Sequence, residues 1–297
     1  MLLHAAGIHY SAWQWSASKL NPACSQHAQP NAGMRRSTRH LTTSPHVQAH
    51  WLRRRFGSIY AFDYLVNSNQ TQEVKASVIP ILAKLGAVLN PSFNTHHYPL
   101  LDAIRRSEPK VVSALLAAGA DPNYQNIGHT PLQSAAYYGN TALVTLLLNA
   151  GASARGVDLY GGTALTMAMN CNCSFELVSA LMAAGADVNA RAVSTFHGQS
   201  FTALTRLMET WGHEDVPLLK LFLDAGADLE VLMPVHEDSI LTAAVWTGNA
   251  EAVRMLIEKG ANVNPPGDPR DSPLRAAMKA RNPVMIALLR NAGARLL

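Results

Sequence analysis

The feature that most constrains this sequence is the regular recurrence of the dipeptide Gly-Ala, which begins at Gly86, Gly119, Gly151, Gly185, Gly226, Gly260 and Gly293. The successive intervals are 33, 32, 34, 41, 34 and 33 residues. An apolar run with helical spacing precedes nearly every copy, and a polar turn such as Asp121-Pro122-Asn123 follows most of them. A period of this length is typical of units that bury their apolar faces only by stacking on one another. The sequence therefore predicts a linear stack of similar units.

Each unit contains a signal for the start of a helix about 21 residues before its Gly-Ala, clearest at Thr130-Pro131, Thr163 and Ser272-Pro273. A Thr or Ser hydroxyl can accept a hydrogen bond from a free backbone N–H at the helix start, and Pro is tolerated at the first helical position. Gly139 and Gly248 are placed to end this first helix, because glycine adopts positive φ at little cost. A second, more apolar helix then runs to the Gly-Ala. The predicted unit is a helix–turn–helix followed by a turn-rich loop.

These residues resemble the ankyrin repeat family. The clearest copy runs from Gly128-His129-Thr130-Pro131-Leu132 to Gly139-Asn140, and it continues through Leu146-Leu147-Leu148 to Gly151-Ala152. The resemblance covers about residues 57–297. It implies an all-α ankyrin-repeat solenoid, in which β-hairpin finger loops project from stacked helix pairs. It also implies a concave face, built from the fingers and the first helices, that binds another protein.

Departures from the repeat define the expected domain organisation. Residues 57–90 carry the end signature but no Thr-Pro-Leu, and Pro80 is expected to interrupt their second helix, so we expect a degenerate first unit. The ankyrin repeat domain is thus expected at 57–297, with about seven units. The 41-residue interval contains insertions around 190–200 and 209–217. These insertions belong either to a binding face or to surface loops that tolerate lengthening.

Residues 1–56 are expected to form a basic, mostly disordered N-terminal arm. From Met1 to Phe62 the sequence holds seven Lys and Arg residues and no Asp or Glu. Alternatives for the arm are an organelle transit peptide, a phosphate contact through Arg53-Arg54-Arg55, and a true start of translation at Met34. We expect a cytoplasmic location, with the nucleus, or an organelle if the arm is a transit peptide, as alternatives. A hydrophobic fraction of 48% excludes a wholly disordered protein, and no apolar stretch is long enough to span a membrane.

The family geometry places a set of candidate partner-binding residues on the concave face. They are Arg105, Arg106, His129, Tyr137, Tyr138, Tyr160, Asn170, Glu209, Trp211, Asp238, Trp246, Thr247 and Lys279. Aromatic and Arg side chains dominate binding energy at protein interfaces, and the scaffold itself requires no aromatic residue at these positions. The alternative is that some of the aromatic rings fold down onto the next unit and only pack there.

Charge is uneven along the predicted stack. Residues 201–240 hold eight acidic and two basic residues, so basic groups of a partner would be steered toward this region unless the acids only solvate the surface. From Arg270 onward the last unit holds six basic residues and one acid. This basic end is either a solvated cap, which a terminal repeat needs, or a contact surface.

The sequence gives little support for catalysis or for a bound metal. Cys171-Asn172-Cys173 resembles half of a metal site, but no second cysteine pair exists and His96-His97 lies more than two units away. We find no His-Glu-x-x-His, no Gly-x-Ser-x-Gly and no phosphate-binding glycine loop. We therefore expect no enzyme activity, cofactor or metal, and a non-catalytic module that binds a partner protein. The alternative is a nucleic-acid or phosphate binder that uses the arm and the last unit.

Overall fold

The computed structural model describes residues 44–90, 98–125, 129–170, 174–193, 200–210, 215–234, 238–265 and 272–296. The chain divides into two parts, 1–48 and 49–297. Of the first part, only residues 44–48 are described, and 45–48 are helical. The predicted arm therefore lies largely outside the described residues.

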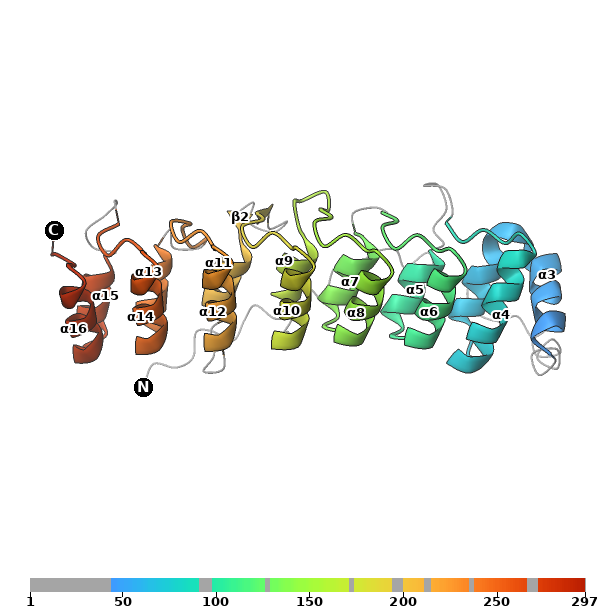
Figure 1. The fold of residues 1–297 in the computed structure, drawn as a ribbon, viewed down its shortest axis with the longest axis horizontal. Coiled ribbons are helices and arrows are strands. Elements are labelled where there is room, and N and C mark those ends of the chain that lie inside the picture. Colours follow the sequence, from blue (N-terminus) through green and yellow to red (C-terminus); the bar gives the residue numbers. More distant parts are fainter. Residues whose placement is uncertain are drawn as a thin grey trace, which may run out of the picture. The chain divides into compact units, whose positions relative to one another are not determined.

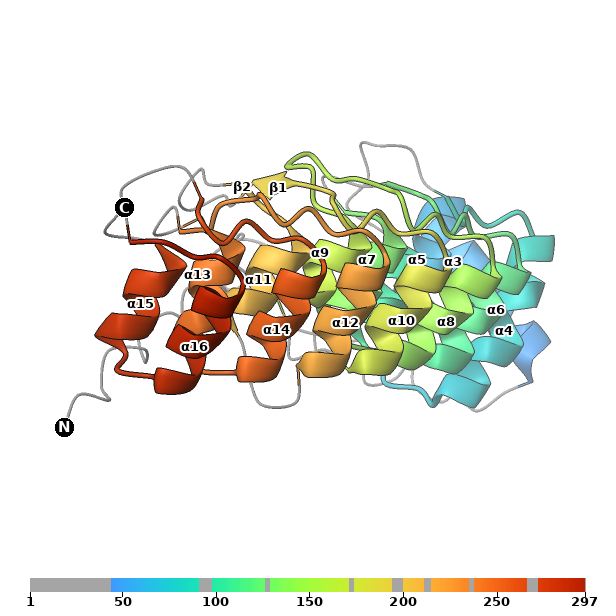
Figure 2. The ribbon, with the colours of Figure 1, turned by 60° about the vertical axis from the view of Figure 1, so that its left-hand side comes forward.

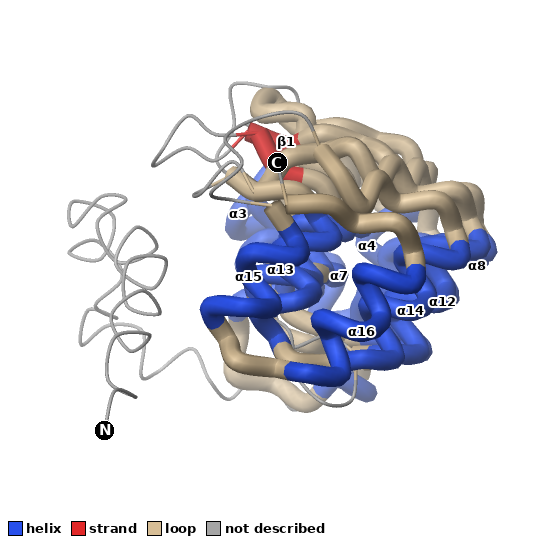
Figure 3. The backbone as a smooth tube through the Cα atoms, turned by 90° about the vertical axis from the view of Figure 1, so that its left-hand side faces the viewer, coloured by secondary structure: helices blue, strands red, loops and turns tan. Residues whose placement is uncertain are grey.

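The second part is a row of helix pairs arranged in two layers (Figures 1 and 3). The first helices of the pairs are residues 58–67 of α3 (Pro45–Asn67), α5 (Pro99–Arg105), α7 (Pro131–Tyr137), α9 (Ala164–Ala168), α11 (Ala203–Glu209), α13 (Ile240–Thr247) and α15 (Pro273–Lys279). The second helices are α4 (Gln72–Lys84), α6 (Pro109–Ala117), α8 (Thr141–Asn149), α10 (Phe175–Ala183), α12 (Val216–Asp224), α14 (Ala250–Glu258) and α16 (Pro283–Asn291). This arrangement confirms the predicted all-α solenoid.

Contacts between helices follow the order of the chain. From α5 onward, each first helix packs against its own second helix and against the first helix of the next pair, and the second helices α4 to α16 pack in the same sequential way (Figure 2). Fully buried side chains such as Leu143, Val144 and Leu147 of α8 fill the seams between pairs. The apolar core is therefore continuous along the row, as stacking of incomplete units requires.

The helix starts lie at the residues that the sequence indicated. The hydroxyls of Thr130, Thr163 and Ser272 accept backbone N–H groups of the first turns of α7, α9 and α15. Pro131 and Pro273 occupy the first helical position, where their missing N–H costs no hydrogen bond. The backbone N–H of Thr130 and that of Thr163 each donate in return to the side chain of the third helical residue, Gln133 or Thr166, which completes a capping box.

The turn that joins the two helices of a pair contains a left-handed residue in the second, third, sixth and seventh units. Gly139 and Gly248 supply it with φ of 65° and 76°. Ser107 and Arg281 occupy the equivalent turns with φ of 53° and 52°, which costs a residue with a Cβ about 1–2 kcal/mol. The turn therefore persists where the sequence lacks the glycine.

Asparagine side chains join successive units at the loop side of the row. The Nδ2 of Asn123 donates to the carbonyl of Gly151, 3.0 Å away, and its Oδ1 accepts the N–H of Ser153 at 2.7 Å. The same pair of bonds recurs in three other seams, at Asn90, Asn189 and Asn264. These residues lie in the polar turns after Gly-Ala, so the turns also bind one unit to the next.

The N-terminal end of the row differs from the expectation in two respects. Residues 49–56, which we assigned to the arm, belong to α3, and Ala49 and Leu52 are fully buried in the core. Pro80 does not interrupt the second helix of the first unit, because α4 continues through it. Pro80 lies on the exposed side of α4, where water can satisfy the carbonyl that its ring leaves unbonded.

A buried ion pair connects this first unit to the second. The Nζ of Lys75 lies 2.8 Å and 3.0 Å from the two carboxylate oxygens of Glu108, and it also donates to the carbonyl of Val66 at 2.7 Å. Lys75 is fully buried. A charge without a partner would be costly there, so the pair fixes the register of α4 against the turn before α6.

Where the structure describes them, the fingers contain little regular strand. In the fifth unit, β1 (Ala192–Val193) and β2 (Ser200–Phe201) pair in antiparallel fashion, and in the sixth unit Leu232 and Ser239 form an isolated bridge. The insertion predicted around 190–200 therefore extends a hairpin finger. Its tip, 194–199, lies outside the described residues.

Candidate protein-binding surface

The predicted binding residues fall into two rows. One row, the helix-end row, comprises the ends of the first helices and the residues just after them: Arg105, Arg106, Tyr137, Tyr138, Asn170, Glu209, Trp246, Thr247 and Lys279. The other row, the finger row, comprises His129, Tyr160 and Asp238, which lie before the first helices. A helix of about seven residues, roughly 10 Å long, separates the rows. Trp211 lies outside the described residues.

The aromatic residues of the helix-end row differ in how much of their surface is exposed. Tyr138 and Trp246 each expose 50% of their surface. Tyr137 is half-buried, and its ring contacts Tyr138 edge to face with a centroid distance of 5.4 Å. Packing on a neighbour therefore covers part of Tyr137, whereas about half of the surface of Tyr138 and of Trp246 faces solvent.

Several charged residues of this row are engaged within the chain. The Nε of Arg106 lies 3.3 Å from Glu108, and Arg105 lies 3.3 Å from Asp102. Glu209 accepts a 2.7 Å hydrogen bond from Arg206, whose guanidinium lies 4.4 Å from the centroid of the Phe201 ring. These pairs restrict the positions of the charged side chains in this row.

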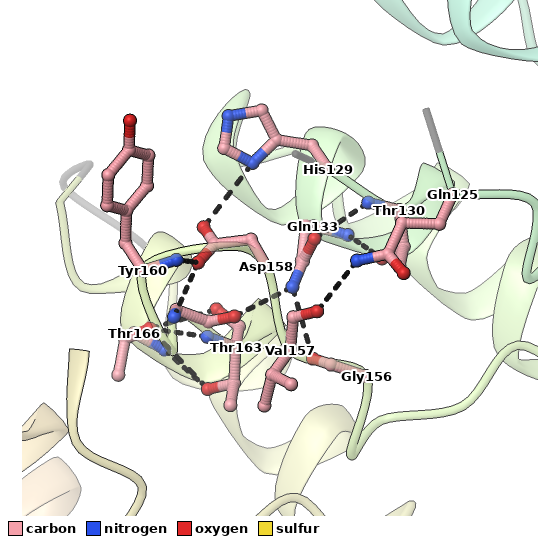
Figure 4. A network of polar contacts seen from close by, with 11 residues as sticks. Gln125, His129, Thr130, Gln133, Gly156, Val157, Asp158, Tyr160, Thr163 and Thr166 are labelled. Atoms are coloured by element: carbon pink, nitrogen blue, oxygen red, sulfur yellow. Dashed lines mark hydrogen bonds and ion pairs between the residues drawn. The ribbon is translucent and has the colours of Figure 1, made fainter. Parts of the chain in front are cut away.

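Asp158 organises the finger that joins α8 to α9 (Figure 4). One carboxylate oxygen accepts the backbone N–H of Tyr160 at 2.8 Å and that of Gly162 at 2.7 Å. The other lies 3.5 Å from Nδ1 of His129. Asp158 is buried, whereas His129 and Tyr160 are exposed on either side of it. The carboxylate thus fixes the backbone that presents both exposed rings.

The pKa of Asp158 reflects two opposing effects. Burial alone would raise the pKa, because it disfavours the charged form. The interaction with His129 and the two backbone N–H groups lower it, and the net pKa lies below the ordinary aspartate value. The finger therefore binds the ionised carboxylate more strongly than the neutral acid.

Gln133 fastens the same finger to the start of α7. Its Nε2 donates to the carbonyls of Gly156 and Gly162, at 3.1 Å and 2.8 Å. Its Oε1 accepts the N–H of Thr130 at 2.7 Å (Figure 4). The sequence analysis did not identify this role. The signal available was a polar residue at a position that should be buried.

Two neighbouring fingers approach each other closely at Gly161. A Cβ at this residue would lie 2.6 Å from the carbonyl oxygen of Arg191, and the φ of Gly161 is +74°. The N–H of Val193 donates to the carbonyl of Tyr160 at 2.9 Å. The fingers of the fourth and fifth units are therefore joined by their backbones, and only glycine fits at the contact.

The finger turns also expose apolar side chains that the sequence analysis missed. Leu159 exposes 76% of its surface, and Val157, Val193 and Leu232 are also exposed. Turn residues follow no helical or strand period, so the periodicity gave no signal for them. An apolar residue between the turn formers Asp158 and Gly161 could have been such a signal.

The expectation that the chain holds no metal stays a prediction, because Cys171, Cys173, His96 and His97 lie outside the described residues. Within the described ranges, no group of three or more His, Cys, Asp or Glu residues is placed to hold a metal ion. No helix in the part of the chain that the structure describes is long and apolar enough to cross a membrane.

Comparison with known proteins agrees with this geometry. A model of three ankyrin repeats matches residues 100–192, and a model of one ankyrin repeat matches 236–268. An ankyrin repeat protein of Acanthamoeba polyphaga mimivirus is 34% identical over 116 residues, which are 37% of this chain and 70% of that protein. The chain belongs to the ankyrin repeat family. Ankyrin repeats generally act as protein–protein interaction modules.

Solved ankyrin domains show the same architecture. The ankyrin repeat domain of Bcl-3 superposes with a TM-score of 0.60 at 26% identity, covering 77% of this chain and 96% of that chain. The human ASB11 ankyrin domain gives a TM-score of 0.52 at 27% identity, covering 67% and 86%. The mouse B-cell lymphoma 3 protein homolog is 31% identical over 144 residues, which are 48% of this chain but 30% of the relative. The ankyrin units here therefore correspond to only part of that longer protein.

Proposed function

We infer that this chain is a non-catalytic recognition module that holds a partner protein against the helix-end row and the finger row. The observation that carries this inference is the half-exposed state of Tyr138 and Trp246 near the ends of the first helices of two different units. Large aromatic side chains bury much area with few rotatable bonds, so they are favoured as anchors at interfaces. The family's general role in protein interaction supports the same inference.

The mechanism that we infer is preorganisation. The helix ends are fixed by seams of fully buried side chains, and the fingers by Asp158, Gln133 and the backbone contact at Gly161. A partner then meets side chains whose positions are already set, and little ordering entropy is lost on binding. Leu159 and Tyr160, presented by the Asp158 turn, extend the proposed surface to the fingers.

The test compares one double variant with a matched control. Tyr138→Ala combined with Trp246→Ala removes two anchors from the helix-end row, whereas Phe175→Ala removes an exposed aromatic ring from α10, in the second-helix row. The partner is captured from the source cells with the full chain, and its affinity for each variant is measured by titration calorimetry. We expect the double variant to weaken binding at least about tenfold, the size of two ordinary anchor losses, and Phe175→Ala to leave it unchanged.

All three substitutions remove exposed rings, so we expect the thermal unfolding midpoint to change little. Equal affinity of the wild type and the double variant, with both folded, would contradict the proposed surface. If Phe175→Ala lost binding and the double variant did not, the interface would lie on the second-helix row.

A further inference from the structure

The carboxylate of Asp158 has one oxygen that its own finger leaves without a hydrogen bond. Oδ1 accepts the N–H groups of Tyr160 and Gly162, but Oδ2 accepts no hydrogen bond from the described residues. The side chain of Asp158 exposes only 1% of its surface. A Cβ at Gly162 would lie 2.6 Å from Oδ2, so the turn also closes tightly on this oxygen. A buried, ionised oxygen without a hydrogen bond is costly, so any group that can donate to it is favoured.

The imidazole of His129 faces this oxygen from the preceding finger (Figure 4). Its Nδ1 lies 3.5 Å from Oδ2 of Asp158, farther than an ordinary N–H···O bond of about 2.7–3.2 Å. The side chain of His129 is 51% exposed, so protons reach it from the solvent. A small approach of the protonated ring would make a charge-assisted hydrogen bond. Because His129 precedes α7 and Asp158 precedes α9, that bond would join two successive units.

Neutral groups surround the pair on the two helices that it joins. The start of α7 brings Thr130 and Gln133 close to it, and the start of α9 brings Thr163 (Figure 4). The phenol of Tyr160 lies beside the carboxylate on the same finger. None of these side chains carries a charge between about pH 5 and 8.

The charged residues of the neighbouring loops are engaged with other partners. The Nε of Arg155 donates to the carbonyl of Gly185 at 3.1 Å, and the guanidinium of Arg191 lies 3.9 Å from the carboxylate of Asp228. His197, in the tip of the fifth finger, lies outside the described residues. Histidine is the side chain that ordinarily changes charge between about pH 5 and 8, so the described part of this site has one group suited to sense pH.

We propose that His129 and Asp158 form a pH-sensitive latch between the third and fourth units, which closes when the imidazole is protonated. The imidazolium then donates to Oδ2 and fixes the fourth finger against the third unit. The contribution of the closed latch to stability is present at low pH and is lost as the pH rises and the imidazole becomes neutral. It also disappears below about pH 4, where aspartate becomes protonated.

The latch would regulate the surface that the fourth finger presents, Leu159 and Tyr160, and this consequence rests on the proposed function. With the latch open, the finger is held by its own turn and by Gln133. With it closed, the two exposed side chains lose less ordering entropy when a partner binds. Binding through the finger row is therefore expected to be tighter at pH 5.5 than at pH 8.

The first test is a double-mutant cycle on the full chain, which needs no partner. Wild type, His129→Gln, Asp158→Asn and the double variant are unfolded with urea at pH 8 and at pH 5.5. At pH 5.5 we expect a coupling between the two sites of about two- to fivefold in the unfolding equilibrium constant, and at pH 8 a much smaller one. All other histidines are common to the four proteins and cancel. His50→Gln, at an exposed histidine of α3, is the matched control and should show no coupling with Asp158→Asn.

The second test measures the consequence for binding. The affinity of the captured partner for wild type, His129→Gln and His50→Gln is measured at the same two pH values. We expect His129→Gln to bind about two- to fivefold more weakly than wild type at pH 5.5 and equally at pH 8, and His50→Gln to match the wild type at both.

Two results would overturn the proposal at different steps. No coupling at pH 5.5, or equal coupling at both pH values, would show that the latch does not form. Coupling at pH 5.5 with equal partner affinities of wild type and His129→Gln would overturn its role in regulating binding. The proposed function is tested separately, because it depends on the loss of binding in the Tyr138→Ala and Trp246→Ala double variant.

Discussion

At the scale of single residues, the surface depends on buried polar groups that hold exposed ones. Asp158 and Gln133 are buried, and both bind backbone groups of the finger that carries Leu159 and Tyr160. A buried polar group is tolerated only when it is hydrogen-bonded, so these bonds restrict the finger to one conformation. The positions of the exposed residues therefore depend on buried side chains, which substitution of the exposed residues alone would not reveal.

Asp158 gives a prediction about pH. Its folded-state pKa lies below the ordinary aspartate value, so its ionised form stabilises the fold above about pH 4, and this contribution disappears as the pH falls through the lower, folded-state pKa. Asp158→Asn keeps an oxygen that can accept the N–H groups of Tyr160 and Gly162 but carries no charge. We expect the variant to be less stable at pH 7 and the difference to shrink below about pH 4. Urea unfolding at pH 7, 5, 4 and 3 measures it, and a difference independent of pH would contradict the assigned role.

At the scale of elements, the seams differ in how they are fastened. Asn90, Asn123, Asn189 and Asn264 each donate to a carbonyl and accept an N–H in the next unit. Arg155, at the equivalent position, keeps only the donated bond, from its Nε to Gly185. Glu230 occupies this same position in the seam between the fifth and sixth units. A carboxylate has no hydrogen to donate to the carbonyl of Gly260. This seam lacks the asparagine connection.

Replacing Glu230 with asparagine should therefore strengthen that seam. Two new hydrogen bonds, to Gly260 and Asn262, are expected to raise the free energy of unfolding by about 1–2 kcal/mol. The complementary variant is Asn123→Ala in another seam. It removes two existing hydrogen bonds and should lower the free energy of unfolding by a similar amount. Denaturant unfolding of the two variants beside the wild type measures both effects. A destabilised Glu230→Asn protein would show that the seam has a geometry that asparagine cannot bridge.

Most of the helix positions could be predicted from the sequence, because the local signals of the successive units agree with one another. Thr130, Thr163 and Ser272 begin helices as expected, since capping chemistry depends on nearby backbone groups alone. The predicted interruption at Pro80 was wrong, because the effect of a proline on a helix depends on whether it lies on the side that faces water. Leu159 and the role of Gln133 were missed, because they depend on how one finger meets the next helix. Long-range contacts of this kind leave no period in the chain.

At the scale of the whole molecule, the described residues of 49–297 form a row in which the main helix–helix contacts of each unit are with its neighbours in sequence. Such a row presents a long face made of equivalent positions, and each unit can vary its exposed side chain without disturbing the seams. Arg105, Tyr137, Asn170, Glu209, Trp246 and Lys279 occupy one such position in six successive units. Specificity for a partner would then lie in the order of these side chains along the row.

The most direct measurement of the central claim is hydrogen–deuterium exchange of the full chain, free and bound to its captured protein partner. Binding on the helix-end and finger rows predicts slower exchange at the backbone amides after Tyr137 and Trp246 and in the Asp158 turn. The second helices α8, α10 and α12 should exchange as in the free chain. Slower exchange confined to those second helices, with the fingers and the first-helix ends unchanged, would contradict the account.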